Sequence, residues 1–178
     1  DLKKALSTGV LMNLDHISIF RRLQKIGIPK KISFRINPGF GKGKFPEIDV
    51  GGKDAKFGMS DELATECYRL AKENGVEHFG IHMMTGSCIL EESYFEKLVQ
   101  TIESMKENIE KKVGIHIEWM DIGGGFGVPY EAFEKALNLL AIGERIQRVK
   151  KSSAVLVIEP GRYIVAEAGT LLTTVTTR

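Results

Sequence analysis

Cysteine is nearly absent from this sequence, which has only Cys67 and Cys88 among its 178 residues. Two cysteines in a chain of this length do not form a disulfide framework, so we expect a reducing, cytoplasmic environment. The four histidines are scattered along the chain. Neither they nor the cysteines show zinc-binding spacing, so no metal site is predicted.

An excess of one charge and a long apolar run are also missing. Lysine and arginine number 25 and aspartate and glutamate 23, giving a net charge of +2. This balance lacks the basic character typical of proteins that bind nucleic acid or acidic membranes. No apolar run approaches the ~18 residues of a membrane-spanning helix, and the first residues do not follow a signal-peptide pattern. We therefore expect a protein that binds neither nucleic acid nor membranes.

Apolar residues make up 43% of the sequence, enough for one large domain with a buried core. Short apolar runs alternate with longer amphipathic segments. The predicted strands are 10–14, 31–36, 78–83, 115–122 and 154–158, with a further strand rich in Thr and Val at 170–177. The predicted helices are 17–26, 60–74, 90–111 and 133–149, with a helical turn at 163–168 and a Gly-rich and Lys-rich loop at 37–54. Ser60 is expected to cap the helix at its start and Gly75 at its end.

This alternation predicts an α/β fold with a parallel sheet covered by helices, because strands this apolar offer no face to solvent. The spacing of the strands fits either a doubly wound sheet or a (β/α)8 barrel of the TIM type. A complete barrel usually needs ~250 residues. About five β/α units in this chain would therefore form a partial barrel, a little over half of a complete one.

Polar or glycine residues follow each predicted strand. They are Arg35 and Asn37, His82 and Ser87, the glycines at 123–125, and Glu159 and Arg162. In parallel α/β folds the carboxyl ends of the strands form one rim, on which active sites are built. Each residue alone is best explained as an ordinary loop start. Their repetition at successive strand ends predicts a site.

The strongest local motif is Gly-Gly-Gly-Phe-Gly at 123–127, which lies between a predicted strand and a predicted helix. Glycines lack Cβ and let backbone N–H groups converge on an anion, and a helix start adds to that attraction. The motif is not a P-loop, and it lacks the acidic partner of a dinucleotide-binding loop. Phosphate binding is the favoured interpretation, and a tight turn with close helix–strand packing is the alternative.

Glu-Pro-Gly-Arg at 159–162 closes the next predicted strand. Pro160 fixes φ and Gly161 permits an unusual φ, so the turn is stiff and would aim Glu159 inward. A salt bridge between Glu159 and Arg162 is the simple alternative. Beside a glycine anion site, the carboxylate could instead hold a heterocyclic nitrogen protonated, and the guanidinium could bind phosphate or a substrate carboxylate.

Five motifs in order resemble one known family. They are Phe-Arg-Ile-Asn-Pro-Gly at 34–39, Lys-Phe-Gly-Met at 56–59, Gly-Ile-His with Gly-Ser within 80–87, Asp-Ile-Gly-Gly-Gly-Phe-Gly-Val-Pro-Tyr at 121–130, and Glu-Pro-Gly-Arg at 159–162. Together they resemble the decarboxylases that depend on pyridoxal phosphate (PLP) and have an alanine-racemase-like barrel. The glycine loop followed by Val-Pro-Tyr at 128–130 is most similar to the sequence of the diaminopimelate decarboxylase branch. The alternatives are an ornithine or arginine decarboxylase, a non-catalytic PLP-binding barrel, or a phosphosugar or nucleotide enzyme sharing only the glycine loop.

The resemblance implies a role for each residue on the rim. Glu159 is implied as the catalytic residue, because it would pair with the pyridine nitrogen of PLP and keep it protonated. Arg162 is also implied to bind substrate. The residues implied to bind the cofactor are Arg35, Met84, Ser87, Gly123, Gly124, Gly125, Glu159, Gly161 and Arg162, with Tyr130 bordering the phosphate loop.

Two histidine positions of the family need comment. Met84 stands where the family has a histidine stacked on the cofactor ring. Its polarizable sulfur can cover a ring face but cannot supply the same hydrogen bonds. His82 matches an earlier family histidine, and packing inside the barrel and contact with the cofactor are equal alternatives for it.

Two parts of the family pattern are not found in residues 1–178. They are the Schiff-base lysine within Tyr-Ala-x-Lys-Ala-Asn and the Cys-Glu-Ser-x-Asp motif of a C-terminal β domain. We therefore expect residues 1–169 to form part of a PLP-binding barrel and residues 170–178 to begin the β domain. The chain would be a middle fragment, inactive alone, of a homodimeric decarboxylase that converts the small amino acid meso-diaminopimelate to lysine.

Overall fold

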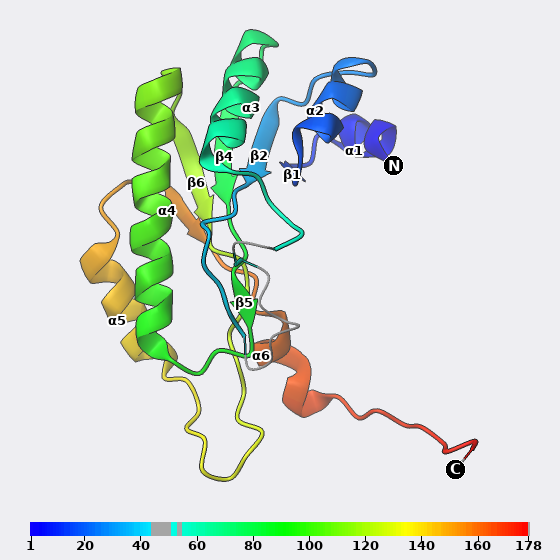
Figure 1. Ribbon diagram of the computed structural model, residues 1–178, viewed down its shortest axis with the longest axis vertical. Helices are drawn as coiled ribbons and strands as arrows, with labels where there is room; N and C mark the ends of the chain where they lie inside the picture. Colours follow the sequence, from blue (N-terminus) through cyan, green and yellow to red (C-terminus); the bar gives the residue numbers. More distant parts are fainter. Residues whose placement is uncertain (44–50, 53–54, 178) are drawn as a thin grey trace.

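Five parallel strands form the central sheet in the order β1-β2-β4-β6-β7 (Figure 1). The computed structural model describes residues 1–43, 51–52 and 55–177, so the predicted loop at 37–54 lies partly outside the described residues. The strands are β1 (Met12–Leu14), β2 (Lys31–Arg35), β4 (His78–His82), β6 (Ile117–Asp121) and β7 (Val155–Val157). Each strand joins the sheet beside the preceding one, so the described sheet has no reversal of order. A doubly wound sheet requires such a reversal, and the barrel interpretation is therefore the one that fits.

Helices lie between successive strands of this sheet, where they pack beside one another, and also before its first strand and after its last (Figure 1). They are α1 (Leu2–Thr8), α2 (Ile17–Gln24), α3 (Asp61–Glu73), α4 (Glu92–Val113), α5 (Leu139–Val149) and α6 (Gly161–Val165), followed by the 3-10 turn η2 (Ala166–Ala168). Helix α2 contacts α3, α3 contacts α4, and α4 contacts α5. A second, two-stranded sheet pairs β3 (Lys42–Gly43) with β5 (Gly86–Ser87). Among the described residues, no helix is long and apolar enough to cross a membrane.

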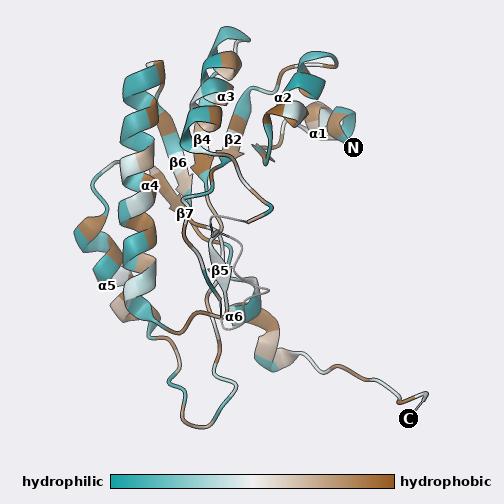
Figure 2. Cartoon of the chain, in the orientation of Figure 1, coloured by the Kyte–Doolittle hydropathy of each residue, from teal (hydrophilic) through white to brown (hydrophobic). Residues whose placement is uncertain are grey.

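Local sequence explains where the helices begin and end. The Ser60 side chain accepts a hydrogen bond from Leu63 N, and Gly75 has a φ of +83° just past the end of α3. Both features were predicted. Along α4, an apolar stripe that includes Phe95, Leu98 and Ile102 is buried against the sheet. Figure 2 shows teal and brown alternating along α3 and α4, as expected for helices with one face on a core.

The two faces of the sheet differ in polarity. Alternate strand residues such as Phe34, Ile81 and Met120 are buried in the core beneath the helices. The residues between them point to the other face, and they are largely polar: Asn13, Ser33, Arg35, His82, Trp119 and Asp121. The strands were expected to offer no face to solvent, but Asn13 on this polar face is exposed and Arg35 and Asp121 are partly exposed. This face is the interior of the partial barrel, which no described helix covers.

Two predicted elements differ from the structure. The helix predicted at 133–149 begins only at Leu139, because the Asn138 side chain accepts hydrogen bonds from Leu140 N and Ala141 N. Phe133, which suggested the earlier start, is 84% exposed. The strand predicted at 170–177 is not formed, and this segment runs away from the sheet (Figure 1). High β propensity does not make a strand without a neighbouring strand to pair with.

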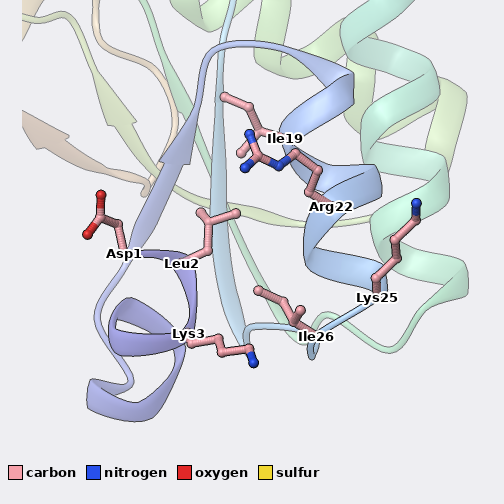
Figure 3. Close-up of a pocket in the computed structure, with 7 residues that line it drawn as sticks. All are labelled: Asp1, Leu2, Lys3, Ile19, Arg22, Lys25 and Ile26. Carbon is pink, nitrogen blue, oxygen red and sulfur yellow. The ribbon is translucent and has the colours of Figure 1, made fainter.

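A cleft between α1 and α2 is drawn in Figure 3. It is lined by Asp1, Leu2, Lys3, Ile19, Arg22, Lys25 and Ile26. None of the predicted site residues lines this cleft, so it takes no part in the site described below.

Candidate functional site

The predicted site residues meet at the carboxyl ends of the strands. Arg35 of β2 lies opposite His82 of β4, which lies opposite Asp121 of β6, which lies opposite Val157 of β7. The glycine loop follows β6 directly, and Glu159 follows β7. One rim therefore carries an arginine, a histidine, two carboxylates and a glycine loop.

The glycine loop packs directly on the neighbouring backbone. A Cβ on Gly123 would lie 2.8 Å from Met83 O, and one on Gly124 would lie 2.5 Å from Glu159 O. Gly123 also has a φ of +71°, a conformation that favours glycine. Glu159 N donates to Gly123 O at 2.8 Å and so joins the end of β7 to this loop. Close backbone approach is thus one reason for glycine here, as the packing alternative proposed.

The N–H groups of Gly123, Gly124 and Gly125 differ in whether a protein group accepts their hydrogen bond. Gly123 N donates to Asp121 Oδ1 at 2.8 Å, and Gly124 N donates to Met84 Sδ at 3.2 Å. In the described part of the chain, Gly125 N donates to no protein group. A Cβ on Gly125 would lie 3.0 Å from Gly86 O, which places this loop beside the Gly86–Ser87 strand. Gly125 is therefore the glycine whose N–H is available to an anion.

The Arg162 side chain also contacts the Gly86–Ser87 strand. Its Nη2 donates to Ser87 Oγ at 3.4 Å, and its Nη1 donates to Tyr130 Oη at 2.6 Å. Within the described residues Arg162 has no carboxylate partner, so the simple salt bridge to Glu159 is not formed. A guanidinium held by two neutral hydroxyls keeps its charge available for an anionic ligand.

Glu159 instead faces the histidine. Its Oε2 lies 3.7 Å from His82 Nε2. One ring nitrogen of His82 and one carboxylate oxygen each of Asp121 and Glu159 all lie within 4.8 Å of one another. Burial, and then the charge of Arg35, lowers the pKa of His82 to about 4, so the imidazole is neutral at pH 7. Burial, helped by the Glu159 charge and opposed by the hydrogen bond from the Gly123 N–H, raises the pKa of Asp121 to about 6.

Arg35 organises the opposite wall of the site. Its Nη2 donates to Met84 O at 3.3 Å, its Nε lies 3.8 Å from Asp15 Oδ1, and its guanidinium lies 5.1 Å from the centre of the Phe57 ring. Burial lowers the pKa of Arg35, while the charges of Asp15 and Glu159 raise it. Arg35 therefore fixes the backbone at Met84, whose side chain lies against the glycine loop.

Three residues of this site were not assigned a role from the sequence: Asn13, Asp15 and Asp121. Asn13 contacts His82, Asp15 pairs with Arg35, and Asp121 accepts the Gly123 N–H. A usable signal was present. Asn13 and Asp15 are polar residues two apart at a strand end, and Asp121 lies two residues before the glycines.

Comparison with known proteins agrees with this arrangement. Residues 1–166 match the family model described as "Pyridoxal-dependent decarboxylase, pyridoxal binding domain". Diaminopimelate decarboxylase of Thermoplasma acidophilum is 36% identical over 177 residues, which cover 98% of this chain and 44% of the relative. The same-named protein of Methanothermobacter thermautotrophicus is 36% identical over 187 residues, covering 99% and 44%. The chain thus spans less than half the length of these relatives.

Solved structures show the same fold. The crystal structure of diaminopimelate decarboxylase from Helicobacter pylori complexed with L-lysine superposes with a TM-score of 0.84 at 28% identity, covering 93% of this chain and 43% of that chain. The M. jannaschii diaminopimelate decarboxylase in complex with L-lysine gives a TM-score of 0.74 at 26% identity, covering 93% and 41%. Both structures support the barrel fold inferred from the order of the strands.

Proposed function

The chain belongs to the family of pyridoxal-dependent decarboxylases, as part of their pyridoxal-binding domain, and we propose that it binds the phosphate and the pyridine nitrogen of PLP in a diaminopimelate decarboxylase. The domain match covers most of the chain and supports the cofactor. The substrate rests on the relatives, which carry that name at 36% identity.

One observation carries the proposal: Glu159 and Arg162 lie in one short turn and do not pair with each other. Arg162 instead joins Ser87 and Tyr130, and Glu159 faces the neutral His82. The turn thus presents a cation at Ser87, on the strand that the Gly125 segment packs against, and, separately, a carboxylate. A ligand with a phosphate at one end and a protonated ring nitrogen at the other suits both groups.

The residues present fit the phosphate of PLP. Gly125 N–H, the Ser87 hydroxyl and the Arg162 guanidinium supply three donors on adjoining segments. Gly123 and Gly124 use their N–H groups within the protein, and we propose that they act by letting the loop and the end of β7 approach closely. Gly161 N donates to Glu159 O and so shapes the turn between the two charged residues.

The chemistry divides between the cofactor and the chain. PLP, when bound, supplies an electron sink for the electrons that remain when carbon dioxide leaves. The Glu159 carboxylate would hold the proton on the ring nitrogen, because an anion beside that nitrogen favours its charged form. Met84 would contact the ring through its polarizable sulfur, and Arg35 fixes the Met84 backbone. We propose that Arg162, besides binding the phosphate, also binds a carboxylate of the substrate.

The remaining parts of the proposal concern the longer protein. We propose that residues 170–178 begin its β domain, that the lysine joined to the cofactor lies outside residues 1–178, and that the protein is a homodimer. The chain alone would then show no turnover.

The test is a decarboxylation assay on the full-length protein with PLP. Carbon dioxide release is measured with meso-diaminopimelate, ornithine and arginine as separate substrates, and the amine product is identified. The proposal expects lysine from meso-diaminopimelate at the highest kcat/KM. A preference for ornithine or arginine would move the protein to another branch of the family. PLP binding without turnover of any amino acid would indicate a non-catalytic barrel.

A further inference from the structure

His82 and Glu159 are linked to two polar residues of the barrel interior. His82 Nδ1 lies 2.9 Å from Asn13 Nδ2, and Asn13 Oδ1 accepts a hydrogen bond from Ser33 Oγ at 2.8 Å. His82 is only 5% exposed, and its Nε2, which is 3.7 Å from Glu159 Oε2, has no hydrogen-bond partner among the described residues. An unbonded nitrogen buried beside a carboxylate requires an explanation.

Two arrangements of hydrogens satisfy the Ser33–Asn13–His82 contacts. In one, the Asn13 amide donates to an unprotonated Nδ1, and the ring proton is on Nε2. In the other, the amide is turned over, Nδ1 carries the proton and donates to Asn13 Oδ1, and Nε2 presents a lone pair.

Glu159 distinguishes between these arrangements. A lone pair on Nε2 would face a carboxylate oxygen and repel it, whereas an N–H on Nε2 would be attracted to that oxygen. The contact of 3.7 Å is longer than a hydrogen bond, and at 57% exposure the Glu159 side chain is not locked in this position. The carboxylate therefore selects the arrangement with the proton on Nε2.

We propose that Ser33 and Asn13 fix His82 as the neutral tautomer with its proton on Nε2, and that this N–H orients the Glu159 carboxylate. His82 is then a positioning residue that acts through Glu159. Its consequence for decarboxylation rests on the function proposed above, but the tautomer itself is a property of the chain and does not depend on PLP.

The groups around His82 act on its charge in opposite directions. Burial and the charge of Arg35, which lies opposite on β2, disfavour a second proton, while the carboxylates of Asp121 on β6 and Glu159 after β7 favour one. Asp15, directly after β1, pairs with Arg35. Burial and Arg35 prevail, and the pKa of about 4 leaves one proton on the imidazole at pH 7.

The direct test is 15N NMR of histidine-labelled full-length protein, with and without PLP, with the His82 signal assigned by its loss in His82→Gln. At pH 7 the proposal expects a protonated Nε2 and an unprotonated Nδ1 in both samples. A signal from the opposite tautomer, or from a doubly protonated ring, would overturn it. Failure of the protein to bind PLP would count against the proposed function and leave this result intact.

Asn13→Asp provides an independent test. An ionised aspartate at this position can only accept hydrogen bonds, so it favours a proton on His82 Nδ1. Glu159 still favours a proton on His82 Nε2, and the two carboxylates together favour the doubly protonated ring. We expect the measured pKa of His82 to rise by at least about 2 units. Asn74→Asp, at the exposed end of α3, adds the same charge at the other end of the sheet and should leave it unchanged. Equal pKa shifts in both variants would contradict a specific interaction between Asn13 and His82.

A pair of substitutions separates positioning from packing. The Gln side chain can place an N–H near the position of Nε2, whereas Asn can place one only near Nδ1. In the full-length enzyme at saturating PLP, His82→Asn should lower kcat about tenfold or more, as loss of an orienting partner typically does. His82→Gln should restore most of it, with melting curves recorded for both variants. Equal losses of kcat in the two variants would overturn the positioning role.

Discussion

Gly124→Ala is expected to destabilise the protein and displace Glu159 at the same time. The added methyl group would lie 2.5 Å from Glu159 O, which is well inside van der Waals contact. That carbonyl accepts a hydrogen bond from Gly161 N at 2.8 Å, so it cannot retreat without weakening the turn. Overpacking of this kind costs about 1–3 kcal/mol, and a lost hydrogen bond adds about 1 kcal/mol. We expect a loss of about 2–4 kcal/mol in the free energy of unfolding.

The matched control is Gly143→Ala in helix α5. A Cβ at Gly143 meets nothing within 4 Å, and alanine is favoured over glycine in a helix interior by about 1 kcal/mol. Urea unfolding of both variants and of the parent measures the two free-energy changes, and a titration with PLP measures cofactor affinity. The control should be as stable as the parent or more stable. If Gly124→Ala were equally stable and bound PLP normally, the close approach of the loop to Glu159 would not matter.

Substitutions at two further carboxylates, Asp121 and Glu103, test how the surroundings of each one affect stability. Because the pKa of Asp121 is raised to about 6, its protonated form favours the folded state, so its contribution is complete below pH ~4 and is lost as the pH rises through 6. Asp121→Asn should therefore gain stability relative to the parent between pH 4 and 7, by about 1–2 kcal/mol after solvent screening; melting curves at several pH values check this, and a constant difference would refute it. Glu103 is 4% exposed and accepts hydrogen bonds from Lys151 N, Ser152 N and Ser152 Oγ. Glu103→Ala should cost about 1–3 kcal/mol in urea unfolding, because it leaves these donors unpaired, and Glu103→Gln should cost less; the reverse order would refute this.

The hydrophobic pattern was sufficient to predict the sheet and most of the helices. Runs such as 31–36 and 78–83 could be recognised because their apolar residues pack under the helices. The helix predicted from Phe133 failed because periodicity does not reveal which apolar residues reach a core, and the Asn138 cap, a local feature, sets the true start. The strand predicted at 170–177 failed because pairing depends on residues distant in the sequence.

The sequence was sufficient to predict that the site residues lie at the strand ends, but not which of them contact one another. The motifs placed Glu159, Arg162 and the glycines together, and the order of strands explains why they meet. Which groups pair could not be read from the sequence: the Glu159–Arg162 salt bridge offered as an alternative is not formed, and Glu159 faces His82 instead. The polar network through Asn13 joins residues 69 positions apart, and it depends on the register of three strands.

The measurement that tests the central claim most directly is the kcat of Glu159→Gln in the full-length protein at saturating PLP, recorded beside a melting curve. The substitution keeps the size of the side chain and leaves Ser87, Gly125 and Arg162 untouched, so phosphate affinity should be largely retained. Loss of the anion beside the ring nitrogen should lower kcat on the order of 10²-fold, or about 2.7 kcal/mol of barrier. If Glu159 served only the turn, stability or cofactor affinity would fall while kcat of the fully loaded enzyme stayed at the parent value. An unchanged kcat would remove Glu159 from the mechanism.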